Sequence, residues 1–549
     1  MSSLRRWSMP FAAALFMAPL GVTQAQFTRA DTLRGAWNTP GRSWWDVTYY
    51  HLDVRVNPAD SSLAGWTTIG YRTTAPGREM QIDLKPPLRI DSVRQGDRQL
   101  QWRDEGAAHF VTGMTHDRTG AEAITVFYSG HPTIAPRPPW DGGISWSTDS
   151  LGRPWVVTTD QGVGASIWWP NKDTQADEPD SMRVTVHLPA SVGTYVGPGR
   201  LESDTTANGW TTRTWFVNDP INNYAIALNL GHYVHWHERY DGEAGPLTFD
   251  FFPLDYHEAA ARRQWSQARP MMACFEHWFG PYPWYTDGYK LIDVTYPGME
   301  HQSAVTYGNG FANGYGGRDA SGSGLGLEWD FIIVHESAHE WWGNSITTPD
   351  LADMWVHESF ANYAENLYVE CRSGKAAGAR YVIGTRRGIR NDRPVIPTYG
   401  VNAQGSGDMY PKGGNMLHTI RQIVADDAKW RDILRGLQAT FRHRITTGAE
   451  VQAYISRKAG IDFSKVFEQY LTTIDVPELA YQRTTTGVRY RWQHVVPGFD
   501  MPVDVVTAPG SVQRLHPTVV WQELALPPDA TFVVDENYYV TTRAMDSAP

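Results

Sequence analysis

The chain has 549 residues, of which 41% are hydrophobic and 19% are charged, so it is long enough for about three or four domains with ample core. The formal net charge is −11 at pH 7 and no basic patch stands out, which argues against a nucleic-acid partner. Aromatic residues make up 13% of the chain. The favoured interpretation of this content is aromatic-rich β structure, and the alternative is substrate pockets with aromatic walls.

The amino end has the pattern of a signal peptide. Arg5 and Arg6 form a positively charged start, and a short apolar run spans Pro10 to Val22. Small residues within Thr23 to Ala25 predict cleavage that removes residues 1–25, so we expect a secreted or periplasmic protein. A twin-arginine signal is a minor alternative. The apolar run is short for a transmembrane helix, and no later segment is apolar enough to form a stable membrane span.

Residues 26–255 are predicted to form an amino-terminal β domain. Between Asp46 and Tyr240, apolar and polar residues mostly alternate, which is typical of half-buried strands. Tyr50 to Val56 shows this alternation clearly. Similar short runs recur between clusters of Gly, Pro and Asp, which punctuate strands.

Residues 256–474 are predicted to form a mainly helical domain. His257 to Phe279 carries good helix formers and ends at Gly280-Pro281, a helix stop. Gly308 to Gly326 is rich in Gly, Ser and Asn, and it predicts a long loop. Such a loop either borders a functional site or is a surface insertion.

Residues 475–549 are predicted to form a small β-sandwich-like domain. The alternating pattern returns here, because Val488, Tyr490 and Trp492 are separated by single arginines. The whole chain is therefore predicted to be a multidomain α+β protein.

Cys274 and Cys371 are the 2 cysteines of the chain. A secreted protein can pair them, but they lie far apart in the sequence and nothing in it shows proximity. A domain of this size does not need the bridge. Two buried thiols are therefore slightly favoured over a disulfide.

The segment from His335 to His339 carries the main chemical signal. Two histidines four residues apart on a helix project from one face, where their imidazoles can occupy adjacent corners of a zinc site. Zinc lowers the pKa of a bound water to roughly 7, and Glu336 can accept the proton as the water attacks a carbonyl. Apolar neighbours predict a helix that stops near Gly343-Asn344. The alternative is that two histidines flank a surface glutamate by chance.

Glu358 is the candidate third ligand. An apolar stripe from Val356 to Leu367 predicts a helix that packs beside the first one. Glu358 can then take the third corner and leave the fourth open. Two His, one carboxylate and an open position are typical of a catalytic zinc site, with one ion per chain. Without the upstream motif, a solvated helix residue is the simpler interpretation.

The segments His335 to Asn344 and His357 to Ala361 resemble the zinc aminopeptidases of the aminopeptidase N and leukotriene-hydrolase type, within the gluzincins. The departures are His357 for the usual Asn, Ser359 for Gly and Glu340 for Gln. None of them removes a ligand, but together they indicate an atypical branch of the family. The resemblance implies a saddle-like β domain, a thermolysin-like catalytic domain and a β-sandwich, as in a short form without the family's large C-terminal helical domain.

Pro297 to His301 resembles the family's Gly-x-Met-Glu-Asn exopeptidase motif, with Gly298, Met299 and Glu300 in place. In the family this Glu binds the free α-amine of the substrate, so the resemblance implies that role for Glu300 and a substrate-binding position for its two predecessors. A carboxylate that faces an ammonium can recognise the free amino end of a chain. A surface acid in a turn is the alternative, and the first and last residues of the segment depart from the motif.

Two further segments extend the resemblance. Tyr410 to Gly413 is similar to the family's Tyr-x-Lys-Gly segment, which implies that Tyr410 donates a hydrogen bond to the oxyanion. Gln161 stands where the family's β domain lends a Gln or Glu to the amine pocket. A structural tyrosine and a plain loop glutamine are the respective alternatives.

These features predict an active zinc aminopeptidase whose partners are peptides with a free amino end. A thermolysin-like endopeptidase is the first alternative, and it would not need Glu300. A binding protein on a peptidase scaffold is the second, but it predicts loss of a ligand or of Glu336, and none is lost. The preferred amino-terminal side chain and the oligomeric state are left open.

Overall fold

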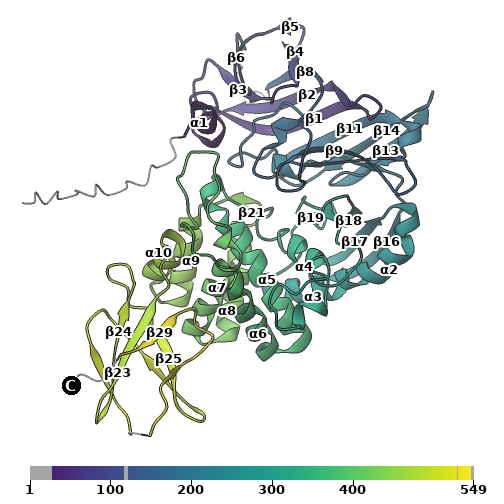
Figure 1. Cartoon of the computed structure of the whole chain (residues 1–549). Helices are drawn as coiled ribbons and strands as arrows, with labels where there is room; N and C mark the ends of the chain where they lie inside the picture. The colour runs from purple at the N-terminus through teal and green to yellow at the C-terminus, as the bar shows by residue number, and fades with distance from the viewer. Residues whose placement is uncertain (1–26, 116–121, 528, 546–549) are drawn as a thin grey trace, which may run out of the picture.

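The computed structural model describes residues 27–115, 122–527 and 529–545 (Figure 1). The predicted signal peptide, residues 1–25, lies outside the described residues. Along the described chain a β-rich region is followed by a mainly helical region and then by a second β region. The predicted multidomain α+β fold is confirmed. Within the described residues, no helix combines the length and apolar character needed to cross a membrane.

The amino-terminal region is built on an eight-stranded sheet in the order β13-β14-β11-β1-β2-β8-β4-β5. Its central strand β1 pairs antiparallel with β2 and parallel with β11. Alternate side chains of β1 are buried, as the period of a strand requires. The strands are β1 (Trp45–Asn57), β2 (Ser62–Thr73), β4 (Arg89–Gln95), β5 (Arg98–Gln99), β8 (Glu122–Gly130), β11 (Ser181–Pro189), β13 (Arg200–Ala207) and β14 (Trp210–Val217).

Two smaller sheets complete this region, and one of them leads into the functional site. The four-stranded sheet has the order β12-β15-β10-β9, and the three-stranded sheet has the order β3-β7-β6. The chain leaves β10 and enters the loop that carries Gln161. The strands are β3 (Met80–Asp83), β6 (Gln101–Glu105), β7 (Ala108–Thr112), β9 (Gly143–Thr148), β10 (Pro154–Thr159), β12 (Thr194–Tyr195) and β15 (Asn229–Gly231).

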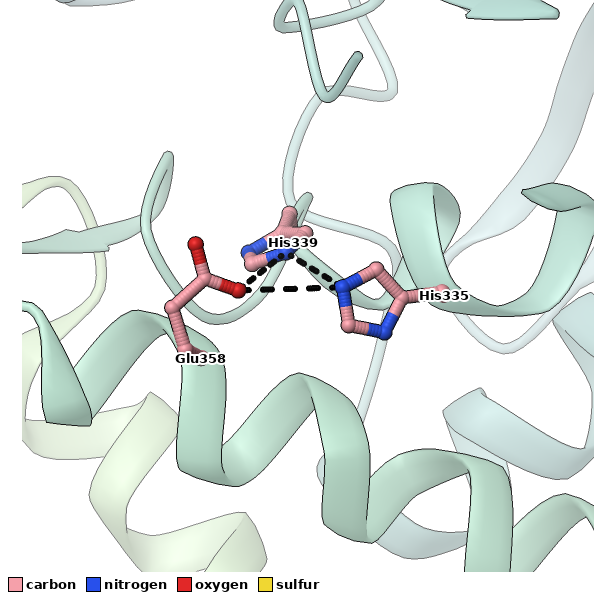
Figure 2. Close-up of side chains that lie close together, drawn as sticks. All are labelled: His335, His339 and Glu358. Carbon is pink, nitrogen blue, oxygen red and sulfur yellow. Dashed lines mark hydrogen bonds and ion pairs between the residues drawn. The ribbon is translucent and has the colours of Figure 1, made fainter. Parts of the chain in front are cut away.

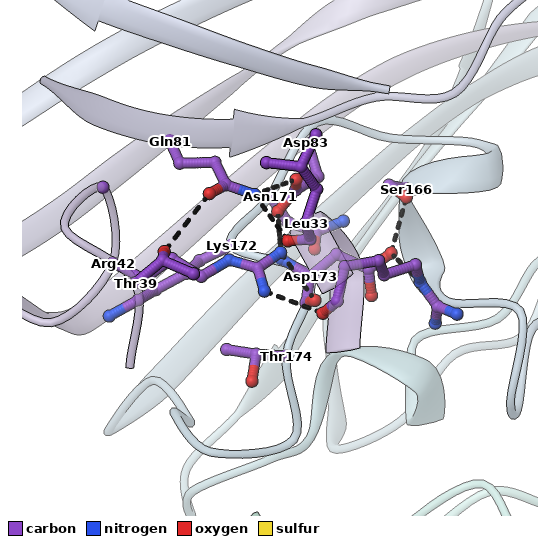
Figure 3. Close-up of polar contacts among 12 residues, drawn as sticks. Leu33, Thr39, Arg42, Gln81, Asp83, Ser166, Asn171, Lys172, Asp173 and Thr174 are labelled. Atoms are coloured by element: carbon purple, nitrogen blue, oxygen red, sulfur yellow. Dashed lines mark hydrogen bonds and ion pairs between the residues drawn. The ribbon is translucent and has the colours of Figure 1, made fainter. Parts of the chain in front are cut away.

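A buried arginine fastens helix α1 (Arg29–Gly35) to this region (Figure 3). Arg42 donates hydrogen bonds to the carbonyl oxygen of Arg34 at 2.8 Å and to Asp83 Oδ2 at 2.6 Å. It also donates to the carbonyl oxygen of Asp173 at 3.1 Å. Arg42 is fully buried. A buried charge is tolerated when it is paired and hydrogen-bonded, so this network fixes α1 against the loop of Asp173.

A five-stranded sheet in the order β16-β17-β18-β20-β19 opens the catalytic region. Because β17 pairs with β18, the boundary predicted between residues 255 and 256 falls inside this unit. Alternation in a sequence identifies a strand but not the sheet that the strand joins. The strands are β16 (Trp236–Gly242), β17 (Gly245–Phe252), β18 (Tyr289–Asp293), β19 (Gly298–Met299) and β20 (Val305–Tyr307).

Helices make up most of the remaining catalytic region. The segment predicted as one helix, His257 to Phe279, is divided by a 3₁₀ turn into α2 and α3, and it ends at Gly280, whose φ of 96° suits glycine. Strands β21 (Ile346–Thr347) and β22 (Arg444–Ile445) pair in parallel. The helices are α2 (Glu258–Gln264), α3 (Ala268–Phe279), α4 (Phe331–Ala338), α5 (Trp355–Ser373), α6 (Lys375–Thr385), α7 (Pro411–Val424), α8 (Asp427–Phe441), α9 (Gly448–Ala459) and α10 (Ser464–Thr472).

Cys274 in α3 and Cys371 in α5 form a disulfide. Their Cα atoms lie 6.1 Å apart, because α3 packs against α5. The expectation of two free thiols is therefore wrong. The pairing follows from helix packing, which the positions of the cysteines in the sequence do not reveal.

The carboxyl-terminal region consists of two small sheets, in the orders β27-β24-β23-β29 and β26-β25-β28. Val488, Trp492 and Val503 from the two sheets belong to the same buried core as the catalytic helices. The strands are β23 (Glu478–Arg483), β24 (Gly487–Gln493), β25 (Val503–Ala508), β26 (Ser511–Leu515), β27 (Gln522–Ala525), β28 (Val533–Val534) and β29 (Thr541–Ala544).

Candidate active site

Helix α4 positions the two histidines. Asp330 caps the helix by accepting hydrogen bonds from two backbone N–H groups at 3.1 and 3.4 Å. The helix ends at Ala338, before the stop predicted near Gly343, and His339 is its C-cap residue. His335 and His339 still share one face, with their Nε2 atoms 3.4 Å apart.

Glu358 from α5 completes a group of three side chains (Figure 2). Glu358 Oε2 lies 3.3 Å from His339 Nε2 and 3.7 Å from His335 Nε2. Ligand atoms about 2.0–2.2 Å from a tetrahedral zinc are about 3.3–3.6 Å from one another. The donor set and its spacing therefore fit one zinc ion. All three side chains are buried.

Both imidazoles turn Nε2 toward this point because their Nδ1 atoms have other partners. His335 Nδ1 donates to Glu365 Oε1 at 2.8 Å, and His339 Nδ1 donates to the carbonyl oxygen of Trp342 at 2.8 Å. A histidine that carries its proton on Nδ1 presents a lone pair on Nε2, which is the form that binds a metal. Glu365 accepts a further hydrogen bond from the Tyr381 hydroxyl at 2.7 Å.

Glu336 faces the same cavity, and strand β19 lies against it. A Cβ added at Gly298 would be 2.6 Å from Ile332 Cγ2 and 3.0 Å from Glu336 Oε1. The glycine therefore lets β19 approach α4 closely. Burial raises the pKa of Glu336 to about 7, against the lowering effect of His335. A base with a pKa near neutrality suits catalysis at neutral pH.

Glu300 and Gln161 meet although they come from different regions of the chain. Gln161 Nε2 donates a hydrogen bond to Glu300 Oε1. Met299, beside Glu300, is buried in β19. The loop of Gln161 is held in turn by Arg34 of α1, whose Nη1 donates to the carbonyl oxygen of Gly162 at 2.6 Å. Burial raises the pKa of Glu300, and His339 opposes this shift.

Tyr410 precedes α7 and lines the same cavity. Its ring centroid is 5.9 Å from that of His335. Burial first, and then the charges of Glu358 and Glu300, raise the pKa of Tyr410 well above its usual range. The hydroxyl therefore keeps its proton and can donate a hydrogen bond.

The three departures from the family motifs have local partners. Glu340 accepts a hydrogen bond from the backbone N–H of Ser303 at 2.9 Å. His357 Nε2 accepts one from the backbone N–H of Thr348 at 3.1 Å. Ser359 Oγ donates to a backbone carbonyl at 2.7 Å. None of these side chains belongs to the group that fits zinc.

One cavity of about 540 Å³ joins these side chains. All nine site residues predicted from the sequence line it: Gln161, Gly298, Met299, Glu300, His335, Glu336, His339, Glu358 and Tyr410. Tyr315 and Ala320 also line it, so the long loop predicted over Gly308 to Gly326 borders the site. Trp140 reaches the cavity from the amino-terminal region and is 69% exposed.

Several residues of the site were not predicted from the sequence. Glu365 lies two turns after Glu358 on the same helix, and this spacing was the available signal. Arg34 and Trp140 lie far from the zinc motif in the sequence. Arg393 also lines the cavity, but no motif marks it. Only the folded chain brings these residues to the site.

The fold and the site together define a zinc metallopeptidase of the gluzincin class. Residues 265–470 match the peptidase family M1 domain. This match includes both histidines, Glu358 and Tyr410. This part of the chain is therefore similar to the catalytic domain of peptidase family M1.

Curated relatives and solved structures agree with this placement. Mouse "Aminopeptidase B" is 24% identical over 471 residues, covering 77% of this chain and 68% of that protein. "Aminopeptidase N" of Lactococcus lactis subsp. lactis is 27% identical over 158 residues, covering 26% of this chain and 18% of that protein. The crystal structure of an M1 zinc metallopeptidase from Deinococcus radiodurans has a TM-score of 0.69 at 20% identity, covering 82% of this chain and 97% of that chain. This structure shows that the fold is shared.

Proposed function

We propose that the chain is a zinc-dependent aminopeptidase that removes residues from the free amino end of peptides. The observation that carries the proposal is the contact between Gln161 and Glu300 in the cavity that holds His335, His339 and Glu358. A buried carboxylate attracts a substrate ammonium. It also leaves an unpaired charge against a blocked amino end, which is costly in a desolvated pocket.

His335, His339 and Glu358 would hold the zinc ion. When bound, zinc polarises the scissile carbonyl and lowers the pKa of water to about 7. Glu336 accepts a proton from the attacking water, and Tyr410 donates a hydrogen bond to the oxyanion that forms. Glu300 and Gln161 orient the amine so that the first peptide bond reaches these groups.

A thermolysin-like endopeptidase would use the same zinc chemistry. It would have no need of a carboxylate that reads a free amine. The names of the relatives, aminopeptidase B and aminopeptidase N, favour the exopeptidase.

The test is the hydrolysis of one peptide with a free amino end and the same peptide acetylated. We expect the free peptide to be trimmed stepwise and the acetylated one to survive. Glu300→Gln should raise KM and lower kcat for the free peptide. It should also reduce the difference in hydrolysis rate between the free and the acetylated peptide. Glu258→Gln, at a half-buried position on α2 that does not line the cavity, is the matched control. Internal cleavage of the acetylated peptide at an equal rate would establish the endopeptidase instead.

We further propose that residues 1–25 direct export. Two facts support this proposal: the charge and apolar pattern of the segment, and the Cys274–Cys371 disulfide, since disulfides persist in oxidising compartments. Fractionation of producing cells and the mass of the mature chain test it. A chain that keeps its first 25 residues inside the cell would contradict it.

A further inference from the structure

The cavity contains one cation among the described residues that line it. Glu300, Glu336 and Glu358 supply three carboxylates, and Arg393 is the one Lys or Arg. Even with a zinc ion bound, which carries two positive charges, the three carboxylates leave the cavity negative, so a substrate with a further negative charge is disfavoured unless a cation meets that charge. Arg393 can therefore decide whether acidic substrates are accepted.

The guanidinium of Arg393 is available for a ligand. Arg393 is exposed, and its Nη2 donates to the carbonyl oxygen of Gly405 at 3.1 Å. No carboxylate of the described residues lies within ion-pairing distance of it. The adjacent Asp392 is engaged elsewhere, since its Oδ1 accepts from Ser406 Oγ at 2.5 Å. A guanidinium has five N–H donors in a planar fork, so most of them are free to bind a carboxylate.

The segment that carries Arg393 is fixed in place. The backbone N–H of Ser406 donates to the carbonyl oxygen of Pro394 at 3.0 Å. Asp408 accepts hydrogen bonds from the backbone N–H groups of Arg390 and Asn391 at 2.9 and 2.6 Å. These contacts tie residues 390–394 to the turn before Tyr410, and the Gly405 contact then aims the guanidinium.

This segment also lies beside the amine end of the cavity. Gln404 is next to Gly405, and its Nε2 would be 3.1 Å from a Cβ added at Gly162. Gly162 follows Gln161, which donates to Glu300. The segment that carries Arg393 is therefore close to the place where Glu300 would bind the amino end of a peptide.

We propose that Arg393 is a specificity residue that binds a substrate carboxylate, and that this carboxylate is the side chain of an amino-terminal Asp or Glu. The inference rests on the proposed aminopeptidase function. The substrate then carries two charges that the cavity matches: its ammonium meets Glu300, and its side-chain carboxylate meets Arg393. Bidentate binding to Arg would give geometric selection as well as attraction.

Aminoacyl arylamides test the inference, because they carry no terminal carboxylate. Arg393→Gln should lower kcat/KM for the Asp and Glu arylamides about 10- to 100-fold and change that of the Leu arylamide less than about 3-fold. Arg393→Lys should retain part of the activity on acidic substrates. Arg393→Glu should invert the preference toward Lys and Arg arylamides. Arg390→Gln is the matched control, since it makes the same charge change on the same segment and does not line the cavity.

The outcomes separate this inference from the proposed function. If the wild-type enzyme cleaves no arylamide, the aminopeptidase function itself fails. If it cleaves Leu and Glu arylamides and Arg393→Gln affects both equally, or Arg390→Gln has the same effect, the inference fails. A second comparison uses a dipeptide with a free terminal carboxylate and the same dipeptide with a terminal amide. If Arg393→Gln affects only this pair, the carboxylate is the substrate's terminus and the side-chain assignment is overturned.

Discussion

His335 Nδ1 lies 2.8 Å from Glu365 Oε1, so a predicted zinc ligand on α4 is oriented by a carboxylate on α5. Glu365 is fully buried and also accepts from Tyr381. The same helix supplies Glu358. Helix α5 thus contributes one ligand directly and orients a second one.

Glu365→Gln is expected to weaken zinc binding. The amide can accept one hydrogen bond from His335, but it lacks the charge that makes the imidazole a stronger ligand. Loss of such a partner typically lowers metal affinity or activity about 10- to 100-fold. Competition with a chelator measures the affinity, and activity at saturating zinc shows how much of the loss is recovered. Unchanged zinc affinity would mean that Glu365 only fills space.

Glu336→Gln is expected to retain zinc and to lose most of kcat. The amide keeps the size and polarity of the side chain but cannot accept a proton. Metal content and kcat are measured on the same preparation. Loss of zinc from this variant would show that Glu336 acts through the ligands, and the assignment as general base would be wrong.

Tyr410→Phe is expected to lower kcat about 100- to 1,000-fold, the usual effect of removing one oxyanion donor. KM should change little, because the charge that the hydroxyl meets exists only near the transition state. Steady-state kinetics on a Leu arylamide separate the two constants. A raised KM with unchanged kcat would make Tyr410 a residue that binds the ground state.

Gly298→Ala is expected to lower kcat while the chain stays folded. The added Cβ would press on Ile332 and Glu336, so either β19 retreats or Glu336 moves. A displacement of about 1 Å can cost about 100-fold in rate. Ile332→Ala provides space, and the double variant should recover part of kcat. Full activity of Gly298→Ala alone would show that β19 moves freely.

The fold class and nine of the residues that line the cavity were predicted from the sequence: the zinc-binding group from its spacing, and Glu300, Tyr410 and Gln161 from the resemblance to the family. A helix period and a ligand count suffice to select His335, His339 and Glu358. The strands over 236–252 pair with β18 across the boundary predicted between residues 255 and 256, and alternation in a sequence does not reveal such a partner strand. The disulfide, Glu365 and Arg393 depend on how distant elements pack together, and no spacing in the sequence reports that packing.

His301, which replaces the family's Asn beside Glu300, provides a test of pH-dependent stability. His301 is fully buried, and neither ring nitrogen has a hydrogen-bond partner among the described residues. Burial lowers the pKa of His301 to about 3, whereas the unfolded chain has the ordinary value of about 6.5. Below about pH 6.5 the unfolded state therefore gains a proton that the native state excludes. The contribution of His301 to stability is present above pH 6.5 and is lost as the pH falls toward 3, by up to about 1.4 kcal/mol per pH unit.

His301→Asn removes this group and should flatten the acid side of the stability profile. Denaturant unfolding of wild type and variant at pH 7.5, 5.5 and 4.5 measures the effect. Loss of zinc at low pH affects both proteins, so the difference between their free energies of unfolding isolates the histidine. We expect the free energy of unfolding of the variant, relative to that of the wild type, to rise by about 1 kcal/mol or more as the pH falls from 6.5 to 4.5. His131→Asn, at an exposed site, is the matched control for the loss of a histidine. Parallel profiles for wild type and His301→Asn would show that His301 takes up its proton in the native state as readily as in the unfolded chain.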